Sequence, residues 1–204
     1  REIIITAVSA RSAQKDREID LSPYAWEADT VALAKRSDID IFIELMGGHE
    51  GTAKEATEAA LHAGKDVVTA NKALLAHHGQ KLAEKAESGG KVLRFEAAVA
   101  GGIPVVKALT EGLAGNEITR ILGVMNGSCN YILTRMQTEG LSYADVFAEA
   151  DALGYLEADP ELDVGGIDAG HKLALLSSIA YGTEVNFAGV ELEGIGQISI
   201  DDIE

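Results

Sequence analysis

Four short apolar runs rich in β-branched residues alternate with longer helical patterns over the first hundred residues. The expected strands cover residues 2–10, 40–46, 66–70 and 91–97, and the expected helices cover residues 27–37, 52–64 and 71–90. Strands that alternate with helices of ten or more residues form parallel sheets with helices on both faces. The first half therefore predicts an α/β fold with a Rossmann-like, mostly parallel sheet. The glycine-rich turn G-x-G-x-x-G of such folds is not in the sequence, so we expect the sheet to be incomplete at its N-terminus.

The pattern changes after Ala100, and we place a domain boundary near residues 98–102. The second part predicts helices over 103–115, 130–140 and 142–154, a polar loop over 155–166, and an apolar helix that continues to Gly182. Apolar stretches over 117–127 and 190–200 predict strands. We therefore expect a partial dinucleotide-binding domain over residues 1–100 and a partial α+β domain over residues 101–204.

The balance of charge excludes two classes of partner. The chain of 204 residues carries 17 Lys and Arg against 33 Asp and Glu, a net charge of −16. It lacks the basic footprint that nucleic acids and anionic membranes require, whereas a phosphate-bearing cofactor needs only local donors. A single cysteine, Cys129, cannot form an internal disulfide and indicates a reducing cytoplasm. No run of roughly 18 apolar residues predicts a membrane span.

Both ends of the sequence are typical of a chain cut from a longer protein. Arg1 leads directly into a strand without a preceding methionine. The sequence ends at "SIDDIE", where Ser199 caps an expected helix with an acidic first turn. We therefore expect this chain to be a fragment.

Three strand ends carry candidate site residues, because ligands of parallel sheets bind at the carboxyl ends of the strands. Arg11 and Ser12 lie in the basic segment "ARSAQKDR", which suits the 2′-phosphate of NADP; the alternative is a solvated loop. Lys72 stands where a helix begins, a place that disfavours a cation, so it either serves a site or reaches out to water. Glu96 ends a strand in a glycine-rich segment whose carbonyls suit a hard cation; the alternative is a hinge with a satisfied glutamate.

The segment "DVGGIDAGHKLALLSSIAYG" (163–182) combines a buried helix with charge. Apolar residues on nearly all sides predict burial, yet Asp168 and Lys172 stand four apart on one face at the helix start. An exposed pair at this spacing would be worth only about 0.2–0.5 kcal/mol. Together with Glu157 and Asp163 from the acidic loop, the pair instead suits a substrate that bears an ammonium group, with proton transfer by Lys172.

The segment "NGSCN" (126–130) precedes a helix, and helix capping accounts for Ser128 or Asn130. Cys129 has no base close to it in the sequence. We interpret this cysteine as structural rather than as a nucleophile.

Four segments, in this order and spacing, resemble one family: "TANKALLA", "FEAAVAGGIPVVKAL", "ILGVMNGSCNYIL" and "EADALGYLEADPELDVGGIDAGHKLALL". Together they cover nearly the whole chain and are similar to homoserine dehydrogenase. That family interconverts aspartate 4-semialdehyde and homoserine with NAD(P)H on the route to threonine, methionine and isoleucine. The resemblance implies a cytoplasmic homodimer or homotetramer, in which the first part binds the cofactor and the second binds substrate and forms the dimer.

The resemblance also implies catalytic and substrate-binding residues. Lys172 would donate and accept the proton, and Asp163 would belong to the same catalytic group. Lys72 would lie beside the nicotinamide and the substrate. Glu157 and Asp168 would bind homoserine.

Cofactor and cation sites follow from the same resemblance. Gly154 would lie near an NADP or NAD cofactor that is also bound by Arg11, Ser12 and Lys72. A sodium-type monovalent cation would be held by Glu96 and by the main-chain carbonyls of Val99, Gly101 and Ile103. The sequence departs from the family in lacking the glycine turn and in having Ser128 and Cys129 where two threonines are frequent.

Two other functions remain open at this point. One is a different amino-acid or semialdehyde dehydrogenase that shares the Rossmann half, which the segment from Gly154 to Lys172 disfavours. The other is an inactive dimerising fragment, which the missing glycine turn favours for the chain as it stands.

Overall fold

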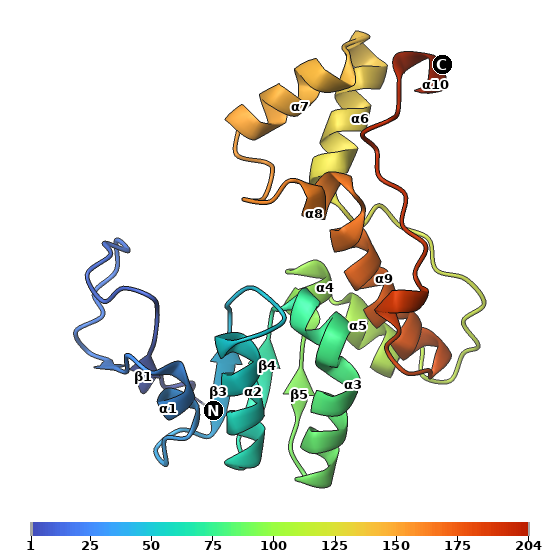
Figure 1. Ribbon diagram of the computed structural model, residues 1–204. Coiled ribbons are helices and arrows are strands. Elements are labelled where there is room, and N and C mark those ends of the chain that lie inside the picture. Colours follow the sequence, from blue (N-terminus) through green and yellow to red (C-terminus); the bar gives the residue numbers. More distant parts are fainter. Residues whose placement is uncertain (1, 204) are drawn as a thin grey trace. The chain divides into compact units, whose positions relative to one another are not determined.

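The computed structural model describes residues 2–203, which form two compact units, Arg1–Val105 and Val106–Glu204 (Figure 1). The first unit alternates strands and helices, and the described residues of the second unit form helices and loops. The division falls shortly after the boundary expected at 98–102. Within residues 2–203, no helix is both long enough and apolar enough to cross a bilayer.

The strands of the first unit pair in parallel in two small sheets. One sheet pairs β1 (Ala7–Val8) with β2 (Ala25–Trp26), and the other contains β3 (Ile41–Glu44), β4 (Asp66–Thr69) and β5 (Leu93–Arg94) in chain order. The helices are α1 (Thr30–Ala34), α2 (Thr52–His62), α3 (Lys72–Ser88) and α4 (Glu96–Ala100). Helices α2 and α3 connect neighbouring parallel strands, as parallel pairing requires. The predicted α/β class with a parallel sheet is confirmed.

The first strand differs from its prediction in length and in partner. Of residues 2–10, only Ala7 and Val8 pair, and they do so with Ala25 and Trp26 rather than within the larger sheet. The preceding apolar run has no neighbouring strand among the described residues, and Ile3 is 89% exposed. The two-residue strand β2 was missed because so short a segment shows no readable alternation.

The strand predicted over 91–97 is also too long. It ends at Arg94, and Glu96 is the first residue of α4 rather than the last of a strand. The segment Glu96–Ala100 is rich in alanine, which has the highest helix propensity, and this explains the correction.

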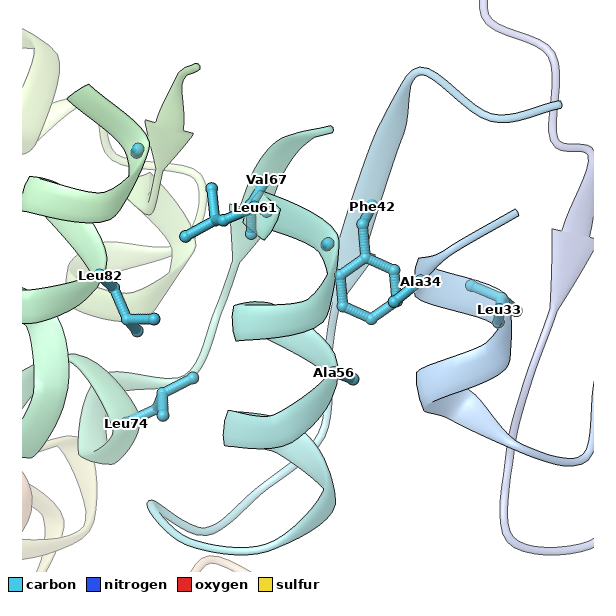
Figure 2. Packing of buried hydrophobic residues seen from close by; sticks show 10 residues of the cluster. Leu33, Ala34, Phe42, Ala56, Leu61, Val67, Leu74 and Leu82 are labelled. Carbon is cyan, nitrogen blue, oxygen red and sulfur yellow. The ribbon is translucent and has the colours of Figure 1, made fainter. Parts of the chain in front are cut away.

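The core of the first unit packs against one face of the β3-β4-β5 sheet (Figure 2). Phe42 and Val67, which are paired across β3 and β4, are 2% and 0% exposed. The surrounding helices contribute Leu33, Ala34, Ala56, Ala60, Leu61, Leu74, Leu82 and Ala86. Ile41 and Ile43 point to the other face and are 52% and 55% exposed. The prediction of helices on both faces is wrong for the described chain, because α1, α2 and α3 all pack on the side of Phe42.

The second unit is built from helices around its own core. Its elements are α5 (Val105–Lys107, which starts at the division), the π-helical turn η1 (Ala108–Gly112), α6 (Gly127–Glu139), α7 (Tyr143–Ala152), α8 (Glu161–Val164), α9 (Ile167–Tyr181), the 3-10 turn η2 (Phe187–Gly189) and α10 (Ile200–Ile203). One buried cluster of this unit contains Ile132, Met136, Val146, Ala150 and Val164, and α9 adds the buried Ala174, Leu175 and Leu176. Gly140, with φ 66°, ends α6, and the predicted cap Ser142 accepts from the N–H of Asp145 at 3.2 Å.

Both strands predicted in the second unit are wrong. Residues 117–126 and 190–199 have no strand assignment, and Leu122 and Val124 are 75% and 78% exposed. A strand needs a neighbour to satisfy its backbone groups, and the described residues offer none to these segments. The predicted loop 155–166 contains the short helix α8, and the predicted helix 103–115 is reduced to residues 105–112.

We predict that two neighbouring residues of β3 differ sharply in their importance for stability. Phe42→Ala empties a buried site and should lower the free energy of unfolding by about 3–5 kcal/mol. Ile43→Ala, on the uncovered face, should lower it by less than about 1 kcal/mol. Urea unfolding of the 204-residue chain measures both, and equal losses would contradict the one-sided core.

Candidate active site

Two glycines bring the acids of α8 and α9 together. Asp163 lies in α8 and Asp168 in the first turn of α9, separated by Gly165 and Gly166. Gly166 has φ 81°, a left-handed conformation that favours glycine. A Cβ at Gly165 would lie 2.6 Å from the carbonyl oxygen of Glu161. The chain therefore turns within two residues, and both carboxylates reach the same partner.

That partner is Asn126, the residue that caps α6. Its Nδ2 donates to Asp163 Oδ1 at 2.8 Å and to Asp168 Oδ2 at 2.9 Å. Its Oδ1 accepts from the N–H of Cys129 at 2.8 Å. All three residues are buried: Asn126 is 8% exposed, and Asp163 and Asp168 are each 3% exposed. Buried carboxylates need such donors, because burial without them is costly.

Lys172 completes this buried group. Its Nζ donates to Asp168 Oδ2 at 2.7 Å and to the carbonyl oxygen of Met125 at 2.7 Å. The lysine side chain is 20% exposed and its acidic partner 3%. The pair is therefore not the exposed ion pair considered as an alternative. Removing one partner of a buried pair costs about 3–5 kcal/mol, which ties this group to the fold as well as to chemistry.

The acidic loop is attached to the same group through its main chain. Asp163 Oδ2 accepts from the N–H of Glu157 at 2.9 Å, and Ser128 Oγ donates to the carbonyl oxygen of Tyr155 at 2.5 Å. Glu157 itself is exposed on this anchored loop. Gly154, with φ 72°, follows α7 and starts the loop.

Cys129 is protected rather than activated. Its Sγ donates to the carbonyl oxygen of Asp163 at 3.2 Å. Burial, reinforced by the nearby carboxylates of Asp163 and Asp168, raises the pKa of the thiol to about 11. The thiol is therefore protonated at neutral pH, in keeping with the prediction of a structural cysteine.

The first unit contains a second group, around Lys72, at the carboxyl ends of β3 and β4. Glu44, fully buried, accepts from Thr69 Oγ1 at 2.5 Å and from the N–H of Met46 at 2.6 Å. Asn71 caps α3, immediately before Lys72, and its Nδ2 donates to the carbonyl oxygen of Gly48 at 2.7 Å. This network fixes the start of α3 and therefore the backbone of Lys72.

Sequence reasoning missed Glu44, Thr69, Asn71 and Asn126 as site residues. The signal available for the first three was polarity at the ends of buried strands. Asn126 lies in the segment 126–130, whose polar residues were interpreted as helix caps. The hydrogen bonds from its amide nitrogen to two acids were therefore not predicted.

The predicted cofactor residues Arg11 and Ser12 lie in an exposed loop after β1. The guanidinium of Arg17 donates to the carbonyl oxygens of Ser12 and Lys15 at 2.7 and 2.8 Å and lies 5.7 Å from the ring centroid of Trp26. Arg17 therefore shapes the loop, on which Arg11 is exposed. An exposed cation on a formed loop fits the phosphate of a nucleotide cofactor.

The predicted cation ligands lie in α4 and the turn after it: Glu96, Val99, Gly101 and Ile103. The carbonyl oxygen of Ile103 accepts from the N–H of Val105 at 2.8 Å and keeps a second lone pair. Over residues 2–203, no cluster of three or more His, Cys, Asp or Glu side chains could hold a metal. A cation here would therefore depend on one carboxylate and on carbonyls, a donor set that fits a weakly held hard ion.

The predicted residues thus fall into two groups that belong to different units. Asp163, Asp168 and Lys172 are brought together in the second unit, with Glu157 joined to them through its main chain. The remaining site residues, apart from Gly154, lie in the first unit: Arg11, Ser12, Lys72, Glu96, Val99, Gly101 and Ile103.

Comparison with known protein families gives matches over both units. Residues 1–96 match the family described as homoserine dehydrogenase, NAD binding domain, and residues 104–204 match the family described as homoserine dehydrogenase. The homoserine dehydrogenase of Neisseria gonorrhoeae is 48% identical over 204 residues, which is all of this chain and 46% of that protein. That of Pseudomonas aeruginosa is 45% identical over 203 residues. The chain spans about half the length of the curated relatives that it matches.

Solved structures give the same result. A homoserine dehydrogenase from Thiobacillus denitrificans superposes with a TM-score of 0.94 at 42% identity, covering 99% of this chain and 46% of that one. A hyperthermophilic archaeal homoserine dehydrogenase in complex with NADPH superposes with a TM-score of 0.77 at 32% identity, covering 88% of this chain and 54% of that one.

We predict that Cys129 resists modification while the chain is folded. Because its pKa is raised from 9.0 to about 11, the thiolate fraction at pH 8 falls roughly a hundredfold, and the reaction rate should fall with it. Reaction with a chromogenic disulfide at pH 8, with and without urea, measures the difference. Fast reaction of the folded chain would contradict the protected thiol.

Proposed function

The chain belongs to the homoserine dehydrogenase family, and from this membership we propose that the protein interconverts L-homoserine and L-aspartate 4-semialdehyde with NADP or NAD. The observation that carries the proposal is the buried group of Asn126, Asp163, Asp168 and Lys172 at the junction of α8 and α9. It places an acid and a base side by side in a partly accessible position, which a proton-transfer reaction requires.

The substrate would be bound by carboxylates. Homoserine and the semialdehyde both carry an ammonium group, which suits the charged side chains of Glu157 and Asp168. Asp163 has both oxygens engaged, by Asn126 and by the N–H of Glu157, so we assign it to orienting its neighbours within the catalytic group. Its loss would release the loop that carries Glu157.

Lys172 would move the proton. An ammonium has three N–H bonds, and two of them are directed at Met125 and Asp168. The third can reach the substrate oxygen, donate a proton as the aldehyde becomes an alcohol, and accept one in the reverse direction. The nicotinamide, when bound, supplies or accepts the hydride.

We propose that the cofactor is held by Arg11 and Ser12 in the loop after β1, with Lys72 and Gly154 nearer the nicotinamide. The exposed guanidinium of Arg11 favours NADP, whose 2′-phosphate it would bind. The NADPH complex of the archaeal relative supports this preference. Lys72 would present its charge to the substrate from the start of α3, which Asn71 holds in place.

Three further assignments belong to the proposal. A sodium-type cation would be held by Glu96 and the carbonyls of Val99, Gly101 and Ile103. The protein would act in the cytoplasm as a homodimer or homotetramer, in the synthesis of threonine, methionine and isoleucine. A different amino-acid or semialdehyde dehydrogenase is not favoured, because both units match homoserine dehydrogenase families.

The experiment that tests the proposal is homoserine-dependent reduction of NADP and NAD, followed at 340 nm. It should be run on the 204-residue chain and on a form that spans the full length of its relatives. Activity in the longer form alone would support the family function and make this chain catalytically incomplete. If neither form oxidises homoserine but one of them oxidises another amino alcohol, the proposed substrate is contradicted.

We predict that Lys172→Ala in the full-length form lowers kcat by about 10²–10⁴-fold, the usual contribution of a positioned proton donor. Lys107→Ala is the matched control, because Lys107 forms an exposed pair with Glu111 at the same spacing of four. The control should change kcat less than about twofold. Near-normal turnover of a folded Lys172→Ala protein would contradict the assignment of Lys172 as the proton donor and acceptor.

We also predict that Arg11→Ala weakens NADP more than NAD. Loss of a charge-assisted contact to the 2′-phosphate should raise KM for NADP by about tenfold or more, with KM for NAD changed far less. Arg36→Ala, which removes a partly exposed arginine paired with Asp38 in the same unit, serves as the control. Equal effects on both cofactors would argue against the phosphate contact.

A further inference from the structure

Asn126 joins the two buried carboxylates of the site through a single amide. Both hydrogens of Nδ2 are used, one on Asp163 Oδ1 and one on Asp168 Oδ2. The amide has only one workable orientation, because turning it over would face Oδ1 toward two carboxylates and Nδ2 toward the N–H of Cys129. The amide oxygen of Asn126 therefore caps the helix, and the amide nitrogen donates to the two acids.

One oxygen of the site is shared. Asp168 Oδ2 accepts from Asn126 Nδ2 at 2.9 Å and from Lys172 Nζ at 2.7 Å. A neutral donor on a carboxylate oxygen draws charge away from it, which weakens the hold of that oxygen on a neighbouring ammonium proton. The amide therefore acts on the lysine through the carboxylate that both contact.

We propose that Asn126 is a positioning residue, which keeps Asp163 and Asp168 side by side as charged acceptors and limits how tightly Asp168 holds the proton of Lys172. The reaction served by Lys172 rests on the proposed function, whereas the contacts of Asn126 do not. Without the amide, two buried like charges would face each other across the α8–α9 junction, and Asp168 would bind the lysine more tightly.

The titratable groups of the buried group and its close sequence neighbours come from α6, α8, α9 and the loop before α8. Asp168 and His171 belong to α9, Asp163 to α8, and Cys129 to α6, while Glu157 belongs to the loop before α8. The His171 ring packs on Phe187, with ring centroids 4.4 Å apart, and the thiol is protonated at neutral pH. The carboxylates are therefore the groups through which a change at Asn126 reaches the lysine.

The competing explanation is that Asn126 only caps α6, and two variants separate the explanations. Asn126→Ser keeps a capping oxygen but removes Nδ2. Asn126→Asp keeps both the cap and the shape of the side chain, but it replaces the donor by a third carboxylate. Ser142→Ala is the control for the pH profile, because it removes the cap of α7 in the same unit and its hydrogen-bond partner is Asp145 rather than Asp163 or Asp168.

The first measurement is the pH profile of kcat for homoserine oxidation in the full-length form. Oxidation needs a lysine that has lost its proton, so Asn126→Asp should move the half-maximal pH upward by about one unit or more. Asn126→Ser should move it in the same direction and lower kcat by about tenfold at pH 7.5. Ser142→Ala should leave the profile in place. An unchanged profile in both variants of Asn126 overturns the proposal.

The second measurement does not depend on activity. The urea midpoint of Asn126→Ser should fall more at pH 7.5 than at pH 4, because acid reduces the repulsion between neighbouring carboxylates that have lost their shared donor. An equal fall at both pH values would mean that Asn126 is only a cap and would overturn the proposal. A wild-type protein inactive toward homoserine would refute the proposed function, and the pH-dependent fall would then still support the positioning contacts.

Discussion

A carboxylate removed from water must be given hydrogen-bond donors, and the second unit meets this requirement with an asparagine at a helix start. In the second unit, Asn126 caps α6 and donates to Asp163 and Asp168. In the first unit, the buried Glu44 instead accepts from Thr69 and from the N–H of Met46, while Asn71 caps α3 and donates to the carbonyl oxygen of Gly48. Asparagine suits this position because it carries an acceptor for the helix N–H groups and two donors for a second segment. A serine or aspartate would cap equally well but could not supply both donors.

The spacing of the charged residues explains why a buried helix can begin with an acid and a base. Residues four apart lie on one helical face, so Asp168 and Lys172 are neighbours by helix geometry alone. Asp163 and Asp168 are five apart, which would place them on different faces of a continuous helix. The turn at Gly165 and Gly166 removes that restriction, and it is crowded enough that a side chain at Gly165 would collide with α8. The chemistry of this site therefore depends on two residues that have no side chain.

The sequence predicted the elements whose formation is local and failed on those that need a partner. Helices α2, α3, α7 and α9 were expected within a few residues of their bounds, because amphipathic spacing and caps such as Ser142 are properties of one segment. The strands expected over 117–127 and 190–200 did not form, because a strand is defined by the neighbour that satisfies its backbone. The same distinction applies to the site. The pair Asp168–Lys172 could be read from spacing, whereas the bridge from Asn126 joins residues 37 and 42 positions apart.

Burial of the charged group also couples chemistry to stability. An exposed pair such as Lys107–Glu111 can be lost at little cost, but a buried pair leaves an uncompensated charge when one member is removed. The cost is offset in part because a carboxylate and an ammonium shielded from water attract each other more strongly. Burial also fixes the orientation of the two side chains. The Lys172 side chain keeps 20% exposure, so the group is not fully closed to solvent. Such a group needs a rigid part and an accessible part. In the second unit, Asn126 and the glycine turn supply the rigidity, and Lys172 supplies the access.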